Sequence, residues 1–293
     1  MAIGLGSSWA ESDHPYATKV AVLATKHDKL DLIAPPLGRI VGLQVEVADV
    51  DTDVLGTFSG ETPRKLPPLD TAIAKARLGM STTGHRLGLA SEGSIGPDPA
   101  MPLAVSDMEI VVLVDDDDGI VIWESHRSWE IVADARSVSP GEDFGAFLSR
   151  VGFPEHRLIV RPNSGSVHPI HKGISSPRQL DAIVAECAAA SRDGLARVET
   201  DLRAHVCPSR RPTIAEASER LARRVAARCP SCGAPGWGGV DVIIGVPCGW
   251  CGTEVSRVAA EVDGCTRCEY RQTRPVVAEN ARADPGECPY CNP

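Results

Sequence analysis

Four Cys-x-x-Cys pairs near one end of this 293-residue chain constrain its fold more than any other feature. The pairs are Cys229/Cys232, Cys248/Cys251, Cys265/Cys268 and Cys288/Cys291, which use eight of the ten cysteines. Two thiolates at this spacing point at one metal ion from a single tight turn, and two such turns complete a tetrahedron. The sequence therefore predicts two structural zinc sites of four thiolates each, in tandem zinc ribbons over residues 229–293.

The segments between the pairs predict how the cysteines share the two metals. Because 15 residues separate the first two pairs and 19 separate the last two, each segment suits a short hairpin. We expect the first pair to bind with the second and the third with the fourth, although spacing alone leaves interleaved pairing open. Disulfides are the alternative, but the first residues show no basic segment followed by an apolar core, and we expect a cytoplasmic protein.

Composition narrows the class of partner. The net charge is −9 and the pI is about 5.4. From Cys229 onward five basic residues face eight acidic ones, and each zinc held by four thiolates adds two further negative charges. Such a tail matches a nucleic-acid backbone poorly. No run of about 18 apolar residues is present to cross a membrane. A small molecule and a protein partner remain the favoured ligands.

Alternating strand and helix patterns over the first 205 residues predict an α/β domain. Strands are expected at 19–25, 41–48 and 86–90, and a helix at 69–80. Residues 109–114 and 120–124 flank Asp-Asp-Asp-Asp-Gly as a β-hairpin, which indicates a mixed rather than parallel sheet. The predicted organisation is an α/β domain with flanking helices (1–205), a basic connecting helix (206–228) and the zinc-ribbon module (229–293).

Polar and charged side chains gather in the loops that follow the first three predicted strands and in the predicted helix 69–80. In chain order they are Thr25, Lys26, His27, Lys29, Glu61, Arg64, Asp70, Lys75 and Glu92. Loops at strand ends tend to meet at one edge of an open α/β sheet. Carboxylates mixed with Lys and Arg suit Mg²⁺ together with a polyphosphate, since Mg²⁺ takes one or two carboxylates plus the phosphates of its substrate. Charges at helix starts also serve as caps or lie in solvent.

Two segments resemble the inosine triphosphate pyrophosphatase superfamily, which includes the Maf-like enzymes. ATKHDKL resembles the Ser/Thr-x-Asn-x-x-Lys opening of that superfamily, and AIAKARLGMSTTGHRLGLASEGSIG resembles its Asn-Ala-x-x-Lys-Ala-Arg helix with the following strand and acidic turn. The resemblance covers residues 19–96. It implies phosphate contacts for Thr25 and Lys29, a helix lysine at Lys75, and metal-binding acids at Asp70 and Glu92.

The sequence also departs from that pattern. His27 stands where those enzymes keep Asn, Lys29 comes one residue early, and Thr71 replaces the Asn of the helix motif. The whole chain, with SGETPR, GLASEGSIGPDP, DLRAHVCPSR and the cysteine-rich tail, resembles a bacterial family whose domain is uncharacterised. This second resemblance implies an architecture and no mechanism.

The leading functional hypothesis is a Mg²⁺-dependent hydrolase that cleaves a nucleoside triphosphate to monophosphate and pyrophosphate. Glu92 and Asp70 would be catalytic and, with Glu61, would hold the metal. Thr25, His27, Lys29, Arg64 and Lys75 would bind phosphate. The alternative is a non-catalytic sensor of nucleotides or phosphometabolites whose zinc ribbons dock a partner protein. A nucleic-acid-binding protein is disfavoured by the acidic tail.

Two further clusters have less specific patterns. His168 and His171 share a loop and would need a third ligand to bind metal. Arg203, His205, Arg210 and Arg211 precede the basic helix, where they could reach a triphosphate or neutralise the acidic ribbons. We expect the second role for this group. Cys187 lies in an Ala-rich helical run and is expected to be a buried structural thiol.

Overall fold

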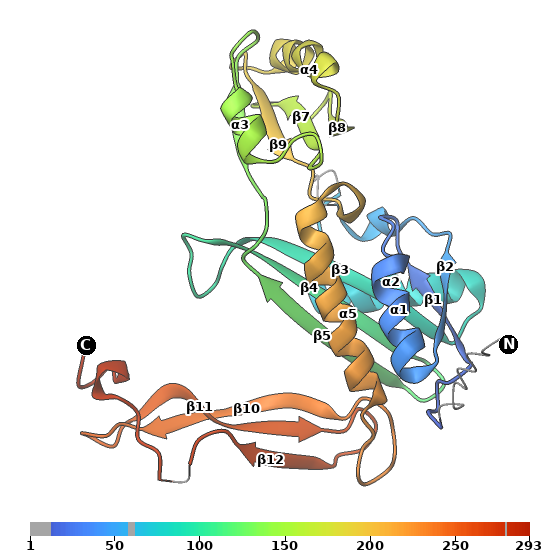
Figure 1. The fold of residues 1–293 in the computed structure, drawn as a ribbon, viewed down its shortest axis with the longest axis vertical. Coiled ribbons are helices and arrows are strands. Elements are labelled where there is room, and N and C mark those ends of the chain that lie inside the picture. Colours follow the sequence, from blue (N-terminus) through green and yellow to red (C-terminus); the bar gives the residue numbers. More distant parts are fainter. Residues whose placement is uncertain (1–12, 58–61, 279) are drawn as a thin grey trace, which may run out of the picture.

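The chain folds into three β-sheets in the computed structural model, which describes residues 13–57, 62–278 and 280–293 (Figure 1). A central sheet carries helices on both faces, a smaller sheet comes after its last strand and lies beyond one end of it, and a long ribbon follows at the C-terminal side. The predicted α/β class with a mixed sheet and flanking helices is confirmed. Within the described residues, no helix is both long and apolar enough to cross a bilayer.

The central sheet has five strands in the order β2-β1-β3-β4-β5. Their bounds are β2 Gln44–Ala48, β1 Val20–Ala24, β3 Leu87–Pro97, β4 Val105–Asp115 and β5 Ile120–Ser128. β1 runs parallel to β2 and β3, whereas β3, β4 and β5 are antiparallel. The predicted hairpin is confirmed, since β4 and β5 pair from Asp115/Ile120 outward.

Helices bury both faces of this sheet, which explains why its strands are almost continuously apolar. α1 (Leu30–Val41) and α5 (Arg211–Ala226) cover one face, where Leu23 and Leu113 pack with Leu221. α2 (Pro68–Thr83) covers the other face, where Val22 and Val112 pack with Ala76. α5 is therefore part of the central core, in addition to connecting the domains as the sequence predicted.

α1 is one continuous helix although Pro35 and Pro36 lie inside it. Each proline removes one backbone donor from the helix. The buried stripe of Ile33, Leu37 and Val41 repeats every four residues and packs into the core. We attribute the continuity to this packing, which offsets the lost hydrogen bonds.

Residues between β5 and α5 form a separate sheet, here called the inserted domain (residues 129–203). Its four antiparallel strands lie in the order β6-β9-β7-β8. The elements are β6 Ala135–Val138, α3 Gly145–Arg150, β7 Leu158–Pro162, β8 His171–Ile174, α4 Pro177–Ala190 and β9 Ala196–Thr200. Phe147, Leu158, Val184 and Val198 belong to a core of its own. The predicted 1–205 domain thus contains two sheets with separate cores.

The C-terminal ribbon is a three-stranded antiparallel sheet in the order β10-β11-β12. β10 (Gly238–Pro247) and β11 (Glu254–Gly264) are long, and β12 (Arg271–Pro275) pairs with the second half of β11. Four short 3-10 turns complete the described elements: η1 Thr52–Leu55, η2 Ala204–Val206, η3 Pro208–Arg210 and η4 Pro285–Glu287. Figure 1 shows the ribbon extending away from the lower end of α5.

Candidate functional site

The eight paired cysteines form two clusters that could each hold a metal ion. Cys229, Cys232, Cys265 and Cys268 form the proximal cluster, and Cys248, Cys251, Cys288 and Cys291 form the distal cluster. Within each cluster, sulfurs from different Cys-x-x-Cys pairs lie 3.6–3.8 Å apart, a distance far longer than a disulfide bond. A zinc ion with Zn–S bonds of about 2.3 Å separates its tetrahedral sulfurs by roughly 3.8 Å. The clusters therefore fit two four-thiolate zinc sites.

The predicted order of pairing is wrong, because the first pair meets the third and the second meets the fourth. The 15 residues after Cys232 contain the ten-residue strand β10 instead of a short hairpin. A strand advances about 3.3 Å per residue, so β10 carries the chain roughly 33 Å away. β11 brings it back to Cys265, and β12 leads out again toward Cys288. The strands thus alternate the pairs between the two ends of the ribbon.

The proximal cluster is joined to the central domain. Cys232 and Cys265 pack against the core that α1 and α5 form, and Ala234 lies within it. The backbone at Gly236 passes so close to Ile122 of β5 that a Cβ there would overlap its side chain. Arg224 of α5 donates to the Gly239 carbonyl at 2.7 Å. The distal cluster has a separate small core instead, with Val246 and Val255.

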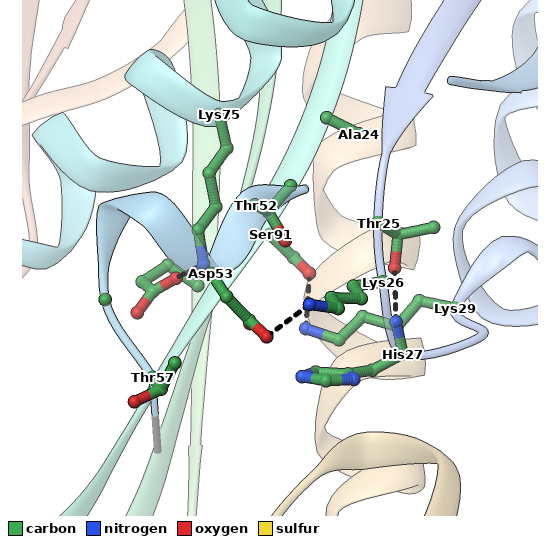
Figure 2. Close-up of a pocket in the computed structure, with 12 residues that line it drawn as sticks. Ala24, Thr25, Lys26, His27, Lys29, Thr52, Asp53, Thr57, Lys75 and Ser91 are labelled. Carbon is green, nitrogen blue, oxygen red and sulfur yellow. Dashed lines mark hydrogen bonds and ion pairs between the residues drawn. The ribbon is translucent and has the colours of Figure 1, made fainter. Parts of the chain in front are cut away.

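A narrow polar cleft, the lysine-lined cleft, opens where β1 ends beside β3. Its volume is about 30 Å³. The lining side chains come from the loop after β1, from η1, from α2 and from β3, and Figure 2 shows Lys26, Lys29, Asp53 and Ser91 pointing toward one another. The lining residues are Ala24, Thr25, Lys26, His27, Lys29, Thr52, Asp53, Gly56, Thr57, Lys75, Ser91 and Glu92.

The loop after β1 places Lys29 inside the protein. Asp28 adopts a left-handed conformation (φ 52°), which Asp tolerates better than most residues and which turns the chain into α1. The Lys29 ammonium then donates to Ser91 Oγ at 2.8 Å, and the side chain is 6 % exposed. Burial lowers the pKa of Lys29 to about 8, only partly opposed by the nearby Glu109 carboxylate. Lys29 is thus a cation in a place that disfavours charge.

Glu92 anchors two more cations on the other face of the sheet. Alternation along β3 directs Ser91 toward the α1/α5 face and Glu92 toward α2. Lys75 of α2 contacts Glu92 Oε2 at 2.6 Å, and Arg64 pairs with Oε1. Arg64 also donates to the Gly93 carbonyl at 3.0 Å. Lysines therefore approach the cleft from both faces of one strand.

β3 is longer than the strand predicted at 86–90, because Ser91-Glu92-Gly93 was expected to form a turn and instead continues the strand. β3 instead pairs with β4 from Leu87/Asp115 to Pro97/Val105. It continues beyond Ala90, the last residue paired with β1. The charged partners of Ser91 and Glu92 make their burial possible, so polar residues occur within the strand.

A buried ion pair lies behind the cleft. Arg210 is fully buried, pairs with Glu109 of β4, and donates to the Leu202 carbonyl. A Cβ at Gly93 would collide with both Arg210 and Glu109, so the strand needs glycine here. Asp107, two residues before Glu109 on the same face, is fully buried, and its carboxylate lies beside Glu109 and Thr213 of α5. Burial, and then the charge of Glu109, raises the pKa of Asp107 to about 7.

The predicted site residues are partly brought together. Thr25, His27, Lys29, Lys75 and Glu92 line the cleft, and Arg64 contacts it through Glu92. Asp70 is exposed at the start of α2 and lies outside the lining. Five helical positions separate it from Lys75, which places the two about 140° apart around the axis. Glu61 lies outside the described residues.

Asp53, Ser91 and Glu109 were not predicted as site residues, and Arg210 was predicted in a different role. Acids at alternate positions 107 and 109 of an otherwise apolar strand were a signal for buried partners. Arg210 and its neighbours were expected to neutralise the ribbons, but Arg210 pairs with Glu109, Arg211 with Asp31 and Arg203 with Asp201. None of these acids belongs to the ribbon.

The histidine loop forms no metal cluster with other described residues. His171 lies on β8 with its Nε2 atom 3.1 Å from Glu186. Cys187, which the sequence predicted to be a structural thiol, is fully buried in α4, and burial raises its pKa to about 11. Cys187 therefore packs as an apolar side chain.

One comparison with known proteins found a match. The family model described as Domain of unknown function (DUF6671) matches residues 75–293. The match begins inside α2 at Lys75, so it includes Glu92, the inserted domain and both cysteine clusters. The loop from Thr25 to Lys29 lies before it. No curated protein matches the chain.

Proposed function

The chain belongs to the family described as Domain of unknown function (DUF6671), and from the geometry of its own residues we propose that it is a nucleotide phosphoanhydride hydrolase. The lysine-lined cleft would bind the phosphate chain, and cleavage would yield a monophosphate and pyrophosphate. The observation that supports this most directly is the convergence of Lys26, Lys29 and Lys75 on one cleft at the ends of parallel strands. Such edges commonly bind phosphates.

The cations suit both binding and catalysis. Lys29 and Lys75 approach from opposite faces of β3, so a phosphate between them would be neutralised from two sides. In hydrolysis, water adds to phosphorus, the bond to the bridging oxygen breaks, and that oxygen leaves with the pyrophosphate. The lysines would stabilise the negative charge that grows on the leaving group.

Glu92 is the carboxylate that would orient the attacking water and receive its proton. Asp53 is the second carboxylate of the lining, and it replaces Asp70 in the expected pair of acids. Mg²⁺ commonly binds through one or two carboxylates plus the phosphates of its substrate, and Glu92 and Asp53 would supply those carboxylates. Glu92 now pairs with Lys75 and Asp53 with Lys26, so each would exchange a lysine contact for the metal. When bound with the nucleotide, Mg²⁺ would supply further charge neutralisation on the phosphates.

A second function, a nucleotide sensor without turnover, is favoured by the contacts of Glu92. Both of its carboxylate oxygens already pair with cations, one with Arg64 and one with Lys75. A carboxylate engaged in this way positions cations for an anionic ligand whether or not a reaction follows. Binding is common to both functions, and turnover separates them.

The deciding experiment measures binding and turnover together. Melting temperatures of the full chain are recorded with nucleoside triphosphates, with and without Mg²⁺, because a ligand of the folded state raises its apparent stability. Released pyrophosphate is then measured for the wild type, Glu92→Gln and the exposed control Glu130→Gln. A hydrolase loses turnover by about 10²-fold or more in Glu92→Gln alone.

Three outcomes are distinct. Turnover that requires Glu92 supports the hydrolase. Stabilisation by nucleotides without any released pyrophosphate supports the sensor. If neither nucleotides nor inorganic polyphosphates raise the melting temperature, the cleft is not a phosphate site and both functions are wrong.

A further inference from the structure

A second cavity, the outer cavity, lies directly beside the lysine-lined cleft. Its volume is about 340 Å³, and four of its lining residues also line the cleft. The remaining residues come from the inserted domain and from η2, which follows it. The lining consists of Lys26, His27, Asp53, Thr57, Lys172, Arg203 and His205. A ligand that leaves the cleft past His27 would therefore enter the outer cavity.

Two stacked histidines line the outer cavity, His27 from the loop after β1 and His205 from η2. The rings of His27 and His205 stack with centroids 5.1 Å apart and planes 25° from parallel. His27 Nδ1 is buried and has no hydrogen-bond partner among the described residues. Burial and, next, the charge of Lys29 together lower the pKa of His27 to about 4. Burial, and then the charge of Arg203, also lowers the pKa of His205. Lys29 and Arg203 thus place positive charge beside the two rings.

Asp201 fixes the cationic side of the outer cavity. Its carboxylate is fully buried and accepts from Arg203 Nε at 2.9 Å and from Arg203 Nη2 at 2.6 Å. It also accepts from the Gly173 backbone N–H at 2.9 Å, next to Lys172 on β8. One buried carboxylate therefore holds both the Arg203 side chain and the strand that carries Lys172. The cations are positioned before any ligand arrives, which reduces the cost of binding.

We propose that the outer cavity is a second phosphate subsite, so that the ligand is a polyphosphate chain extending from the lysine-lined cleft to the inserted domain. The proposal rests on the proposed function, because the cleft supplies the first phosphate site. The outer phosphate would contact Lys172, Arg203 and a ring N–H of His205. The inner phosphate would contact Lys29 and Lys75. Charge-assisted hydrogen bonds of this kind favour phosphate strongly. Ligands with a single phosphate would occupy the cleft alone.

Calorimetric titration of the full chain with inorganic tripolyphosphate and with orthophosphate tests the proposal. The outer variant combines Lys172→Met with His205→Gln, the inner variant is Lys75→Met, and Arg178→Met removes one charge from an exposed position on α4. We expect the outer variant to weaken tripolyphosphate about tenfold or more and to leave orthophosphate within about twofold. The inner variant should weaken both, and Arg178→Met neither.

The outcomes separate the two proposals. If the outer variant binds tripolyphosphate like the wild type while Lys75→Met does not, the second subsite is wrong and the cleft remains a phosphate site. If Lys75→Met also binds like the wild type, or if the wild type binds no tripolyphosphate, the proposed function fails and the subsite with it. Lys172→Arg, which keeps the charge, should retain binding, whereas loss in this variant as well as in Arg178→Met would indicate a general effect on the fold.

Discussion

Lys29 is the residue at which stability and the proposed function oppose each other. Its ammonium is almost fully buried, and its pKa is lowered to about 8 chiefly by burial. A lysine that served only the fold would be replaced at no loss by an apolar side chain of similar length. The cost becomes understandable if the ammonium binds an anion, because a bound phosphate would restore the charge that burial disfavours.

A pH titration of stability tests this view of Lys29. In the unfolded chain the pKa returns to about 10.5. Between pH 8 and 10.5 the unfolded state then binds more protons than the folded state, so the free energy of unfolding rises with pH across this window. Lys29→Met should abolish the rise and increase stability at pH 7 by a few kcal/mol, on the order of 1.4 kcal/mol for each unit of pKa shift.

The measurement is denaturant unfolding at several pH values, with Lys65→Met as the control, since Lys65 is exposed. The control should keep the rise seen in the wild type. A Lys29→Met protein that is less stable than the wild type at pH 7 would show that Lys29 is a structural cation for Glu109 and Glu92.

Residue types and loop positions predicted much of the cleft. Thr25, His27 and Lys29 follow β1, whereas Lys75 lies on α2 and Glu92 on β3, and the sheet brings them together. Asp70 shared the same local signal and lies elsewhere, because the rotation of α2 is set by which of its residues are buried. Arg210 was assigned to the wrong neighbour, since only the return of the chain from the inserted domain places it beside Glu109.

At the scale of elements, the ribbon shows how strand length decides metal pairing. Spacing predicted that the eight cysteines bind two metals but not which turns share one. A segment of 15 residues can form a hairpin or a single long strand, and the valine and isoleucine residues of β10 favour the strand. The pairing then follows from the strand, because each turn lies at the end opposite to its neighbours in the sequence.

Paired substitutions distinguish interleaved from sequential pairing through zinc content alone. Cys248→Ser with Cys291→Ser removes two ligands of the distal cluster and should lower the content from two zinc ions to one. Cys229→Ser with Cys248→Ser removes one ligand from each cluster and should leave both sites incomplete. Elemental analysis of the purified proteins provides the measurement.

Sequential pairing reverses these results, which makes each variant the control of the other. In that arrangement Cys229→Ser with Cys248→Ser would affect a single site, and Cys248→Ser with Cys291→Ser would affect both. Equal zinc content in the two double variants would contradict the pairing described for the ribbon.

On the scale of the whole molecule, two separate parts of the chain build the central domain. β1 to β5 form the sheet, the inserted domain follows, and α5 returns to cover the face opposite to α2. The sequence predicted the alternation of strands and helices on both sides of residue 129, but nothing local distinguishes a strand of one sheet from a strand of another. Contacts distant in sequence, such as Arg210 with Glu109, fix the division.

This arrangement gives the two cysteine clusters different consequences for stability. The proximal cluster packs against the core that α1 and α5 share, so a metal bound there would stabilise the central domain directly. The distal cluster has its own core at the far end of the ribbon, and its loss should remain local.

We expect Cys232→Ser with Cys265→Ser to lower the melting temperature of the central domain by roughly 5 °C or more, corresponding to about 1–2 kcal/mol in a domain of this size. Cys251→Ser with Cys291→Ser should leave it nearly unchanged. Hydrogen exchange resolved to Val22 of β1 and Leu89 of β3 reports on the central sheet alone, so both amides should exchange faster only in the proximal variant. If the distal variant deprotects them equally, the ribbon and the central domain unfold as one unit, and the distal metal supports the lysine-lined cleft as well.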